Sequence, residues 1–184
     1  MRTVLLVEGL SDRVAVETLA ARRGRDLEAE GVAVVSIEGA GNIRAALDRF
    51  GPQGLGVEVA GLYDAGEEEW FRRALEHAGL GSGLGRPELE RLGFFVCVED
   101  LEDELIRALG AAAVEAVVAE QGELRPFRTL QKQPAQRGWT IEAQLKRFLG
   151  THSGRKAQYA EALVQALDLS RVPRPLDLVL AQVS

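Results

Sequence analysis

The sequence predicts an α/β fold built on a mostly parallel four-stranded sheet flanked by helices. Four short apolar runs, rich in β-branched residues, are each followed by a segment whose apolar residues have helical spacing. Strands that alternate with helices favour a parallel sheet with right-handed crossovers and helices on both faces. The apolar runs are Thr3–Val7, Val32–Ile37, Val57–Tyr63 and Phe94–Val98, and the helical segments after them are Asp12–Arg22, Asn42–Phe50, Glu67–His77 and Leu101–Leu109.

The pattern changes after Leu109, where only helical periodicity remains. Three amphipathic segments follow, Ala111–Glu120, Ile141–Leu149 and Lys156–Leu167, separated by proline- and glycine-containing loops. We therefore expect residues 1–110 to form the α/β core and residues 111–184 to form a helical appendage packed on it. The glycine-rich segment 79–85 follows a helix rather than a strand, so it predicts a surface loop and not a phosphate cradle.

Length and composition restrict the class of protein. A chain of 184 residues can bury a substantial core in one domain, and Cys97 is its only cysteine, so no intramolecular disulfide forms. No apolar stretch approaches the length of a membrane span, and the N-terminus leads directly into a strand rather than a signal peptide. We expect a soluble, cytoplasmic protein that does not enter a membrane.

The charge is distributed unevenly along the chain. Residues 1–122 carry 12 Lys and Arg against 23 Asp and Glu, a net charge of −11, whereas residues 123–184 carry 10 against 5, a net charge of +5, which together give the overall −6. An acidic body with a basic C-terminal third suits carboxylates that bind metal beside a separate surface for phosphates. Unequal solvated helix faces would produce the same asymmetry.

Acidic residues stand where the predicted strands end. In a parallel α/β sheet, ligands bind outside the carboxyl ends of the strands. Carboxylates brought to one edge repel each other unless a cation lies among them, and Mg²⁺ or Mn²⁺ prefers such oxygen ligands. These acids are Glu8 and Asp12 after the first strand, Glu38 after the second, Asp64, Glu67 and Glu68 after the third, and Glu99, Asp100, Glu102, Asp103 and Glu104 after the fourth.

Helix capping is an alternative explanation for several of these acids. Ser11 or Asp12 can cap the first helix, Asp100 can cap the fourth, and residues 67–69 can favour a helix start through the macrodipole. Glu8 and Asp64 fit this explanation less well, because we expect each to lie where a strand stops, several residues before the next helix.

The motifs resemble the TOPRIM domain that topoisomerases, bacterial primases and OLD-family (overcoming lysogenisation defect) nucleases share, a Rossmann-like fold. The segment Val7-Glu8-Gly9-Leu10-Ser11-Asp12, with Asp64 after the third strand, is most similar to the OLD branch. Further matches are the turn at residues 39–43, the Leu101-Glu102 pair after the fourth strand and a late basic residue within Ser153-Gly154-Arg155-Lys156.

This resemblance implies a Mg²⁺- or Mn²⁺-dependent endonuclease that hydrolyses phosphodiester bonds of DNA, or of RNA, with two metal ions. Glu8 and Asp64 would be ligands at the shared centre, Asp12 and Glu102 would serve the second ion, and Lys156, or failing that Arg155, would stabilise charge on the phosphate. Lys146 and Arg147, with Arg155 and Lys156, are the expected nucleic-acid contacts. An exposed lysine at a helix start is the alternative for Lys156, and an ordinary surface histidine is the alternative to an acid–base role for His152.

One position departs from the family pattern. TOPRIM domains usually carry Asp-x-Asp after the third strand, whereas this chain reads Asp64-Ala65-Gly66. Glu67 or Glu68 could replace the lost carboxylate only if the turn is rearranged, and Glu67 is the candidate that we choose. The chain also lacks the ABC-type ATPase of full-length OLD nucleases, so that ATPase would come from a separate chain. Two other functions remain open: a degenerate TOPRIM module that binds nucleic acid or a partner without cutting, and a phosphoacceptor-like domain that uses Asp64.

Overall fold

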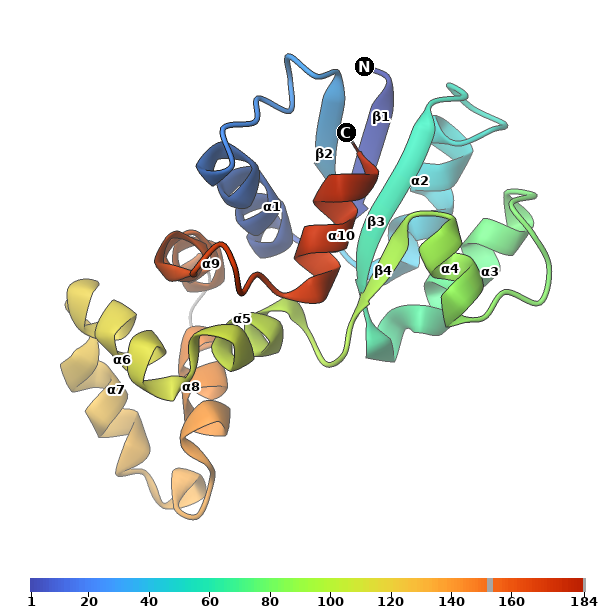
Figure 1. Ribbon diagram of the computed structural model, residues 1–184. Coiled ribbons are helices and arrows are strands. Elements are labelled where there is room, and N and C mark those ends of the chain that lie inside the picture. Colours follow the sequence, from blue (N-terminus) through green and yellow to red (C-terminus); the bar gives the residue numbers. More distant parts are fainter. Residues whose placement is uncertain (152–153, 184) are drawn as a thin grey trace.

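The computed structural model describes residues 1–151 and 154–183. It confirms the predicted α/β class: four parallel strands form one sheet in the order β2-β1-β3-β4, flanked by helices (Figure 1). Because β1 lies between β2 and β3, the end of the first strand borders the ends of two neighbours. The strands are β1 Thr3–Val7, β2 Val32–Ser36, β3 Glu58–Asp64 and β4 Phe94–Cys97.

The helices include three that the sequence periodicity did not predict, α4, α7 and α10. Each carries a proline in its first turn, Pro87, Pro126 and Pro175 respectively. A proline there costs no hydrogen bond, because the first turn has no intrahelical acceptors for its N–H groups. The helices are α1 Leu10–Arg22, α2 Ile43–Phe50, α3 Glu68–His77, α4 Arg86–Arg91, α5 Leu101–Leu109, α6 Ala111–Glu120, α7 Leu124–Gln131, α8 Ile141–Leu149, α9 Arg155–Ala166 and α10 Arg174–Gln182, with short 3₁₀ turns η1 Ala40–Asn42, η2 Ala65–Glu67 and η3 Pro134–Gln136.

Side chains on the two faces of the sheet belong to two separate hydrophobic clusters. Along β1, Val4 and Leu6 point into one cluster, while Leu5 and Val7 point into the other, as the two-residue period of a strand requires. All four side chains are fully buried. The first cluster packs against α2, α3 and α4, and the second packs against α1 and the later helices. Burial on both faces explains why the strands are continuous apolar runs.

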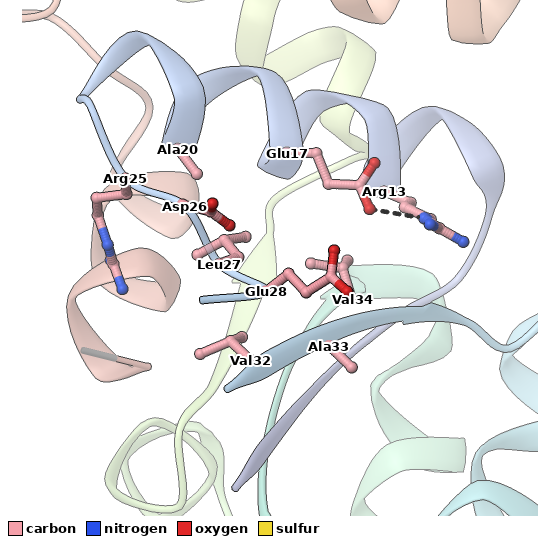
Figure 2. Close-up of a pocket in the computed structure, with 10 residues that line it drawn as sticks. All are labelled: Arg13, Glu17, Ala20, Arg25, Asp26, Leu27, Glu28, Val32, Ala33 and Val34. Carbon is pink, nitrogen blue, oxygen red and sulfur yellow. Dashed lines mark hydrogen bonds and ion pairs between the residues drawn. The ribbon is translucent and has the colours of Figure 1, made fainter. Parts of the chain in front are cut away.

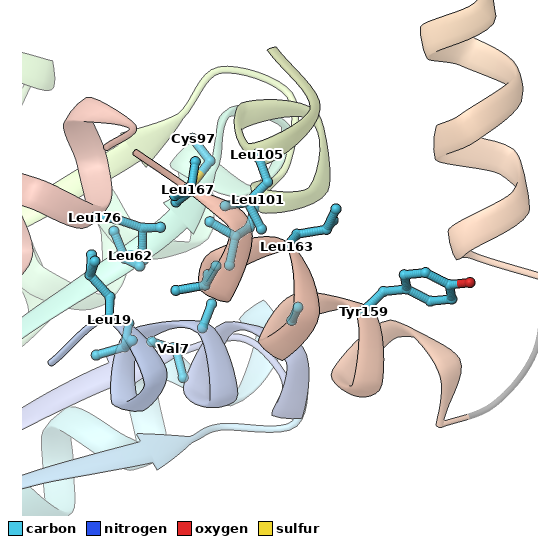
Figure 3. Close-up of a cluster of buried hydrophobic side chains, with 14 of the residues drawn as sticks. Val7, Leu19, Leu62, Cys97, Leu101, Leu105, Tyr159, Leu163, Leu167 and Leu176 are labelled. Atoms are coloured by element: carbon cyan, nitrogen blue, oxygen red, sulfur yellow. The ribbon is translucent and has the colours of Figure 1, made fainter. Parts of the chain in front are cut away.

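The later helices extend the second cluster beyond the sheet. Figure 3 shows Val7 and Leu62 from the strands, Leu101 and Leu105 from α5, and side chains of α9 and α10 packed in one buried cluster. Helix α9 packs on α1, and α10 lies against β3 and β4. Helices α5 to α8 lie past the carboxyl ends of the strands, at the lower left of Figure 1. The helical segments therefore border the edge of the sheet where the acids gather.

No helix in the described part of the chain is long and apolar enough to cross a bilayer.

A close approach inside the sheet requires a glycine at position 61. A Cβ there would lie 2.8 Å from the carbonyl oxygen of Leu6 and 2.9 Å from the ring of Phe94. The missing side chain leaves room for Phe94, which is fully buried and lies edge-on to Phe71. Gly61 thus allows an aromatic residue of β4 to cover β3.

Candidate metal centre at the carboxyl ends of the strands

Glu8 lies immediately after β1 and connects three strand ends. Its carbonyl oxygen accepts a hydrogen bond from the backbone N–H of Gly39 in the turn after β2, at 3.0 Å. Its carboxylate Oε1 accepts a hydrogen bond from the backbone N–H of Asp64 at the end of β3, also at 3.0 Å. Burial raises the pKa of Glu8, the hydrogen bond from Asp64 lowers it, and the negative charge of Glu67 raises it further. The backbone therefore holds Glu8 at the centre of the acidic edge.

Asp12 combines a capping role with a place in the acidic cluster, by which we mean the carboxylates at the carboxyl ends of the strands: Glu8, Asp12, Asp64, Glu67, Asp100 and Glu102. It is the third residue of α1, and its Oδ2 accepts a hydrogen bond from the backbone N–H of Gly9 at 2.8 Å. This is the reciprocal half of a capping box, so the capping alternative holds for Asp12. Its pKa is raised to about 7, mainly by burial and further by the charges of Glu102 and Glu8, while the Gly9 hydrogen bond opposes the shift. Its second carboxylate oxygen is not used by the cap.

Asp64 is the last residue of β3. Burial, and to a lesser extent the negative charges of Glu8, Asp12, Asp100 and Glu102, raise its pKa to about 8. Acids from the ends of β1, β3 and β4 and from the first turns of α1 and α5 therefore act on one another. The expectation that several residues separate these acids from the next helix is wrong for Glu8, because α1 begins at Leu10. It is confirmed for Asp64, since the 3₁₀ turn η2 comes first and α3 begins at Glu68.

Glu102 and Lys156 meet across two helices that are far apart in the sequence. Glu102 lies in the first turn of α5 and is 8% exposed. Its Oε1 lies 3.3 Å from Nζ of Lys156 at the start of α9, yet that oxygen has no hydrogen-bond partner among the described residues. The Lys156 charge also lowers the pKa of Asp12. The single positive charge of Lys156 thus faces two of the predicted metal ligands.

Asp100 has the capping role that the sequence suggested. Its Oδ1 accepts a hydrogen bond from the backbone N–H of Asp103 at 2.9 Å, which starts α5. Its other oxygen, Oδ2, lies 3.0 Å from Nζ of Lys146, which also contacts Glu99 at 3.1 Å. Lys146 therefore joins α8 to the end of β4.

Glu67 and Gly66 occupy the turn that departs from the family pattern. Glu67 ends η2 and is close enough to Glu8 to raise its pKa. A Cβ at Gly66 would meet no heavy atom within 4 Å, and the backbone there is outside the left-handed region. The turn therefore brings Glu67 toward the cluster and leaves open space where the family aspartate would stand.

The acids match a hard divalent cation in chemistry, although they do not enclose one in this side-chain arrangement. All the candidate ligands are carboxylates, and the pKa values of Asp12 and Asp64 are raised by burial and by mutual repulsion, both of which a bound cation would offset. Within residues 1–151 and 154–183, no group of three or more His, Cys, Asp or Glu side chains lies close enough to hold a metal ion. A metal would therefore have to draw these side chains inward.

The predicted nucleic-acid contacts separate into two groups. Arg155 points into the helical part of the chain, where it pairs with Glu123 at 2.8 Å and lies 4.6 Å from the centre of the Phe148 ring. Its neighbour Lys156 faces the acidic cluster. His152 lies outside the described residues.

Lys146, Arg147 and Lys156 border a common cavity of about 310 Å³ beside the acids. Trp139 also lines this cavity, with 49% of its surface exposed. The sequence analysis did not single out Trp139. The sequence feature that could have identified it is an aromatic residue directly after Gly138, in the basic third of the chain.

A second cavity, of about 520 Å³, lies between α1 and the edge strand β2 (Figure 2). Both of its arginines are paired: Arg13 with Glu17 at 2.8 Å, and Arg25 with Glu30, which lies outside the lining. None of the strand-end carboxylates lines it. The predicted metal ligands therefore lie outside this larger cavity.

Comparisons with known proteins identify a related domain in the N-terminal part of the chain. Residues 1–65 match the family model of the "Overcoming lysogenization defect protein-like, TOPRIM domain". This match includes Glu8, Asp12 and Asp64 and ends before Glu102 and Lys156. A search of curated protein sequences finds no match.

Solved structures with the same fold extend the similarity to the whole chain. The C-terminal region of the Xanthomonas campestris pv. campestris OLD protein is 24% identical, with a TM-score of 0.72 over 99% of this chain and 94% of that one. The C-terminal region of the Burkholderia pseudomallei OLD protein is 21% identical, with a TM-score of 0.72 over 99% and 96% of the two chains. The N-terminal part of the chain thus matches the OLD-like TOPRIM domain, and the chain as a whole has the fold of OLD protein C-terminal regions.

Proposed function

We propose that this protein is a divalent-metal-dependent nuclease that hydrolyses phosphodiester bonds in DNA as an endonuclease. The observation that carries the proposal is the hydrogen bond from the backbone N–H of Asp64 to the Glu8 carboxylate, within a set of acids where burial, together with the neighbouring negative charges, raises the pKa of Asp64 to about 8. Such clustering of perturbed acids at a strand edge is typical of functional sites. The match to the OLD-like TOPRIM domain supports the same assignment.

The acids divide into those that would hold Mg²⁺ or Mn²⁺ and those that support the fold. Glu8 and Asp64 would be shared ligands, Asp12 and Glu102 would complete a second position, and Glu67 would contribute from the turn that lacks the family aspartate. Bound divalent ions supply an activated water and neutralise charge on the phosphate. Asp100 serves mainly as the helix cap described above.

Lys156 would act on the substrate rather than on the metal. Its Nζ lies 3.3 Å from a Glu102 oxygen that is otherwise without a hydrogen-bond partner among the described residues, and 52% of the side chain is exposed. It can therefore reach a phosphate at the cluster without losing a well-formed hydrogen bond. A cation placed in this way stabilises the charge that develops on the phosphate in the transition state.

Cleavage of supercoiled and linear DNA in Mg²⁺ and in Mn²⁺ tests the proposal. We expect Glu8→Ala and Asp64→Ala to lower the cleavage rate at least about 100-fold, the upper end of the loss seen when even outer-shell partners of a metal are removed. Glu58→Ala is the matched control, because Glu58 is an exposed acid at the opposite end of the strand that ends in Asp64. Unchanged cleavage by the Glu8 and Asp64 variants would overturn the assignment.

A non-catalytic module is the second candidate, and Gly66 is the observation that favours it. The carboxylate that the family usually places there is absent. Under this alternative, pure protein would bind nucleic acid without metal-dependent turnover. RNA of the same length, offered beside DNA, identifies the nucleic acid. Addition of an ABC-type ATPase from a separate chain, the partner that we propose, reveals whether cleavage depends on it.

A further inference from the structure

Trp139 presents a large aromatic side chain to solvent at an ordered position. Among the Phe, Tyr and Trp side chains that the structure describes, Trp70 and Trp139 are the exposed ones, at 56% and 49%. The backbone N–H of Trp139 donates a hydrogen bond to the carbonyl of Gln136 at 3.2 Å, and the next residue, Thr140, caps α8 through a hydrogen bond from Ala143. The ring therefore projects from a fixed backbone and does not pack into the core.

The cavity beside Trp139 combines this aromatic ring with positive charge. Arg147 is exposed and has no acidic partner among the residues that the structure describes. Lys146 and Lys156 each pair with an acid of the cluster. The charged and aromatic residues that line the cavity are Asp100, Glu102, Trp139, Lys146, Arg147 and Lys156.

The same cavity adjoins the proposed metal centre. Asp100 and Glu102 line it and also raise the pKa of Asp64. A nucleotide that enters the cavity would therefore place its backbone near Lys156 and its base near Trp139. The volume of about 310 Å³ lies at the small end of the range for ligand sites, which suits one nucleotide rather than a duplex.

A basic groove with an aromatic platform is the arrangement that binds single-stranded nucleic acid. In a duplex the faces of the bases are already stacked, so an exposed indole ring has no base face to contact. We propose, building on the nuclease function above, that Trp139 stacks on an unpaired base next to the scissile phosphate. The preferred substrate is then single-stranded, frayed or flapped nucleic acid, with Trp139 as a specificity-determining residue.

Tryptophan fluorescence tests the contact directly. Trp70→Phe leaves Trp139 as the sole tryptophan, and it is titrated with a single-stranded oligodeoxynucleotide, a blunt duplex and an abasic oligonucleotide of equal length, in Ca²⁺ and again in EDTA. Quenching by the single strand alone is expected. The abasic strand keeps the phosphates and lacks the bases, so equal quenching by all three ligands overturns the proposal.

Affinity measurements supply the second arm. Trp139→Ala is expected to weaken binding of the single strand about 5- to 150-fold, the range for one stacked base, while Trp139→Phe retains most of the affinity. Trp70→Ala is the control for loss of an exposed tryptophan. If Trp139→Ala binds the single strand with unchanged affinity, the proposal that Trp139 stacks on a base is overturned.

The cleavage assay separates this inference from the nuclease proposal. Base-dependent quenching without cleavage of any DNA in Mg²⁺ or Mn²⁺ supports the platform and overturns the nuclease. If wild type and Trp139→Ala both cleave single strands and duplexes at equal rates, the nuclease proposal is supported and the stacking role of Trp139 is overturned.

Discussion

The backbone N–H of Asp64 donates a 3.0 Å hydrogen bond to Oε1 of Glu8. This bond joins the ends of two adjacent parallel strands through a side chain, at the place where both residues are proposed to bind metal. It leaves the second oxygen of Glu8 for a ligand. It also separates the structural role of Glu8 from its charge, because a neutral amide oxygen accepts the same bond.

Glu8→Gln should therefore abolish cleavage and spare the fold. The amide Oε1 keeps the acceptor for the Asp64 N–H, whereas the loss of the negative charge removes a metal ligand. Glu8→Ala, by contrast, leaves that N–H without its partner, which we expect to cost about 1–3 kcal/mol. Urea unfolding of the two variants, beside DNA cleavage, distinguishes these effects. Equal stability of the two variants would contradict the role assigned to the hydrogen bond.

The stability of the metal-free protein should fall as the pH rises from about 4 to about 8. The pKa of Asp12 is about 7 and that of Asp64 is about 8, both raised from the ordinary value of 3.8. The folded state therefore holds protons that the unfolded state releases. The resulting stabilisation is complete below the ordinary pKa and is lost as the pH passes 7 to 8.

Thermal unfolding in EDTA across this pH range measures the effect. Asp64→Asn should flatten the profile and raise the Tm at pH 8 by about 2–4 °C for each kcal/mol by which the buried, ionised Asp64 destabilises the fold. Added Mg²⁺ should raise the Tm of wild type more at pH 8 than at pH 6, because binding requires the ionised acids. A Tm in EDTA that is independent of pH would contradict the raised pKa values of these two buried carboxylates.

Gly66→Asp should strengthen metal binding and raise the cleavage rate. A side chain there meets open space, and the backbone does not require glycine. The new carboxylate would stand two residues after Asp64, as in the usual family pattern. Gly66→Asn is the matched control, since it has the same size without the charge. Isothermal titration with Mg²⁺ and Mn²⁺ measures the affinity, and equal values for the Asp and Asn variants would contradict the prediction.

Lys156→Ala should lower kcat about 100- to 1,000-fold, the loss typical of removing one group that stabilises transition-state charge. KM should change less, because Lys146 and Arg147 remain to bind the backbone. Lys156→Arg should recover part of the rate. Lys132→Ala provides the control, because Lys132 is an exposed lysine at the end of α7, away from the cavity beside the acids. A loss confined to KM would instead assign Lys156 to binding.

Gly61→Ala should destabilise the fold by about 1–3 kcal/mol, the usual cost of overpacking a core. The added methyl group would lie 2.8 Å from the Leu6 carbonyl oxygen and 2.9 Å from the Phe94 ring. Gly66→Ala adds the same methyl group in open space and should leave the stability nearly unchanged. Urea denaturation of both variants measures the difference, and equal midpoints would contradict the packing argument.

Local sequence pattern was enough to predict the four strands, the α/β class and the acids at the strand ends. Strand periodicity depends on neighbouring residues, so the end of an apolar run is visible in the chain itself. Glu8 and Asp64 could be singled out for that reason. The helices α4, α7 and α10 could not, because the prolines in their first turns have the same local signature as a loop.

Long-range contacts determined the strand order, the packing of the helices and the cation that faces the acids. The order β2-β1-β3-β4 and the packing of α10 on β3 and β4 depend on pairings between distant segments, which no local pattern encodes. Arg155 and Lys156 illustrate the reason. Successive residues of a helix differ in direction by roughly 100°, so one turns to Glu123 and the other to Glu102. The residue types were plain from the chain, but the rotation of α9 against α1 and α5 determined which cation faces the acids.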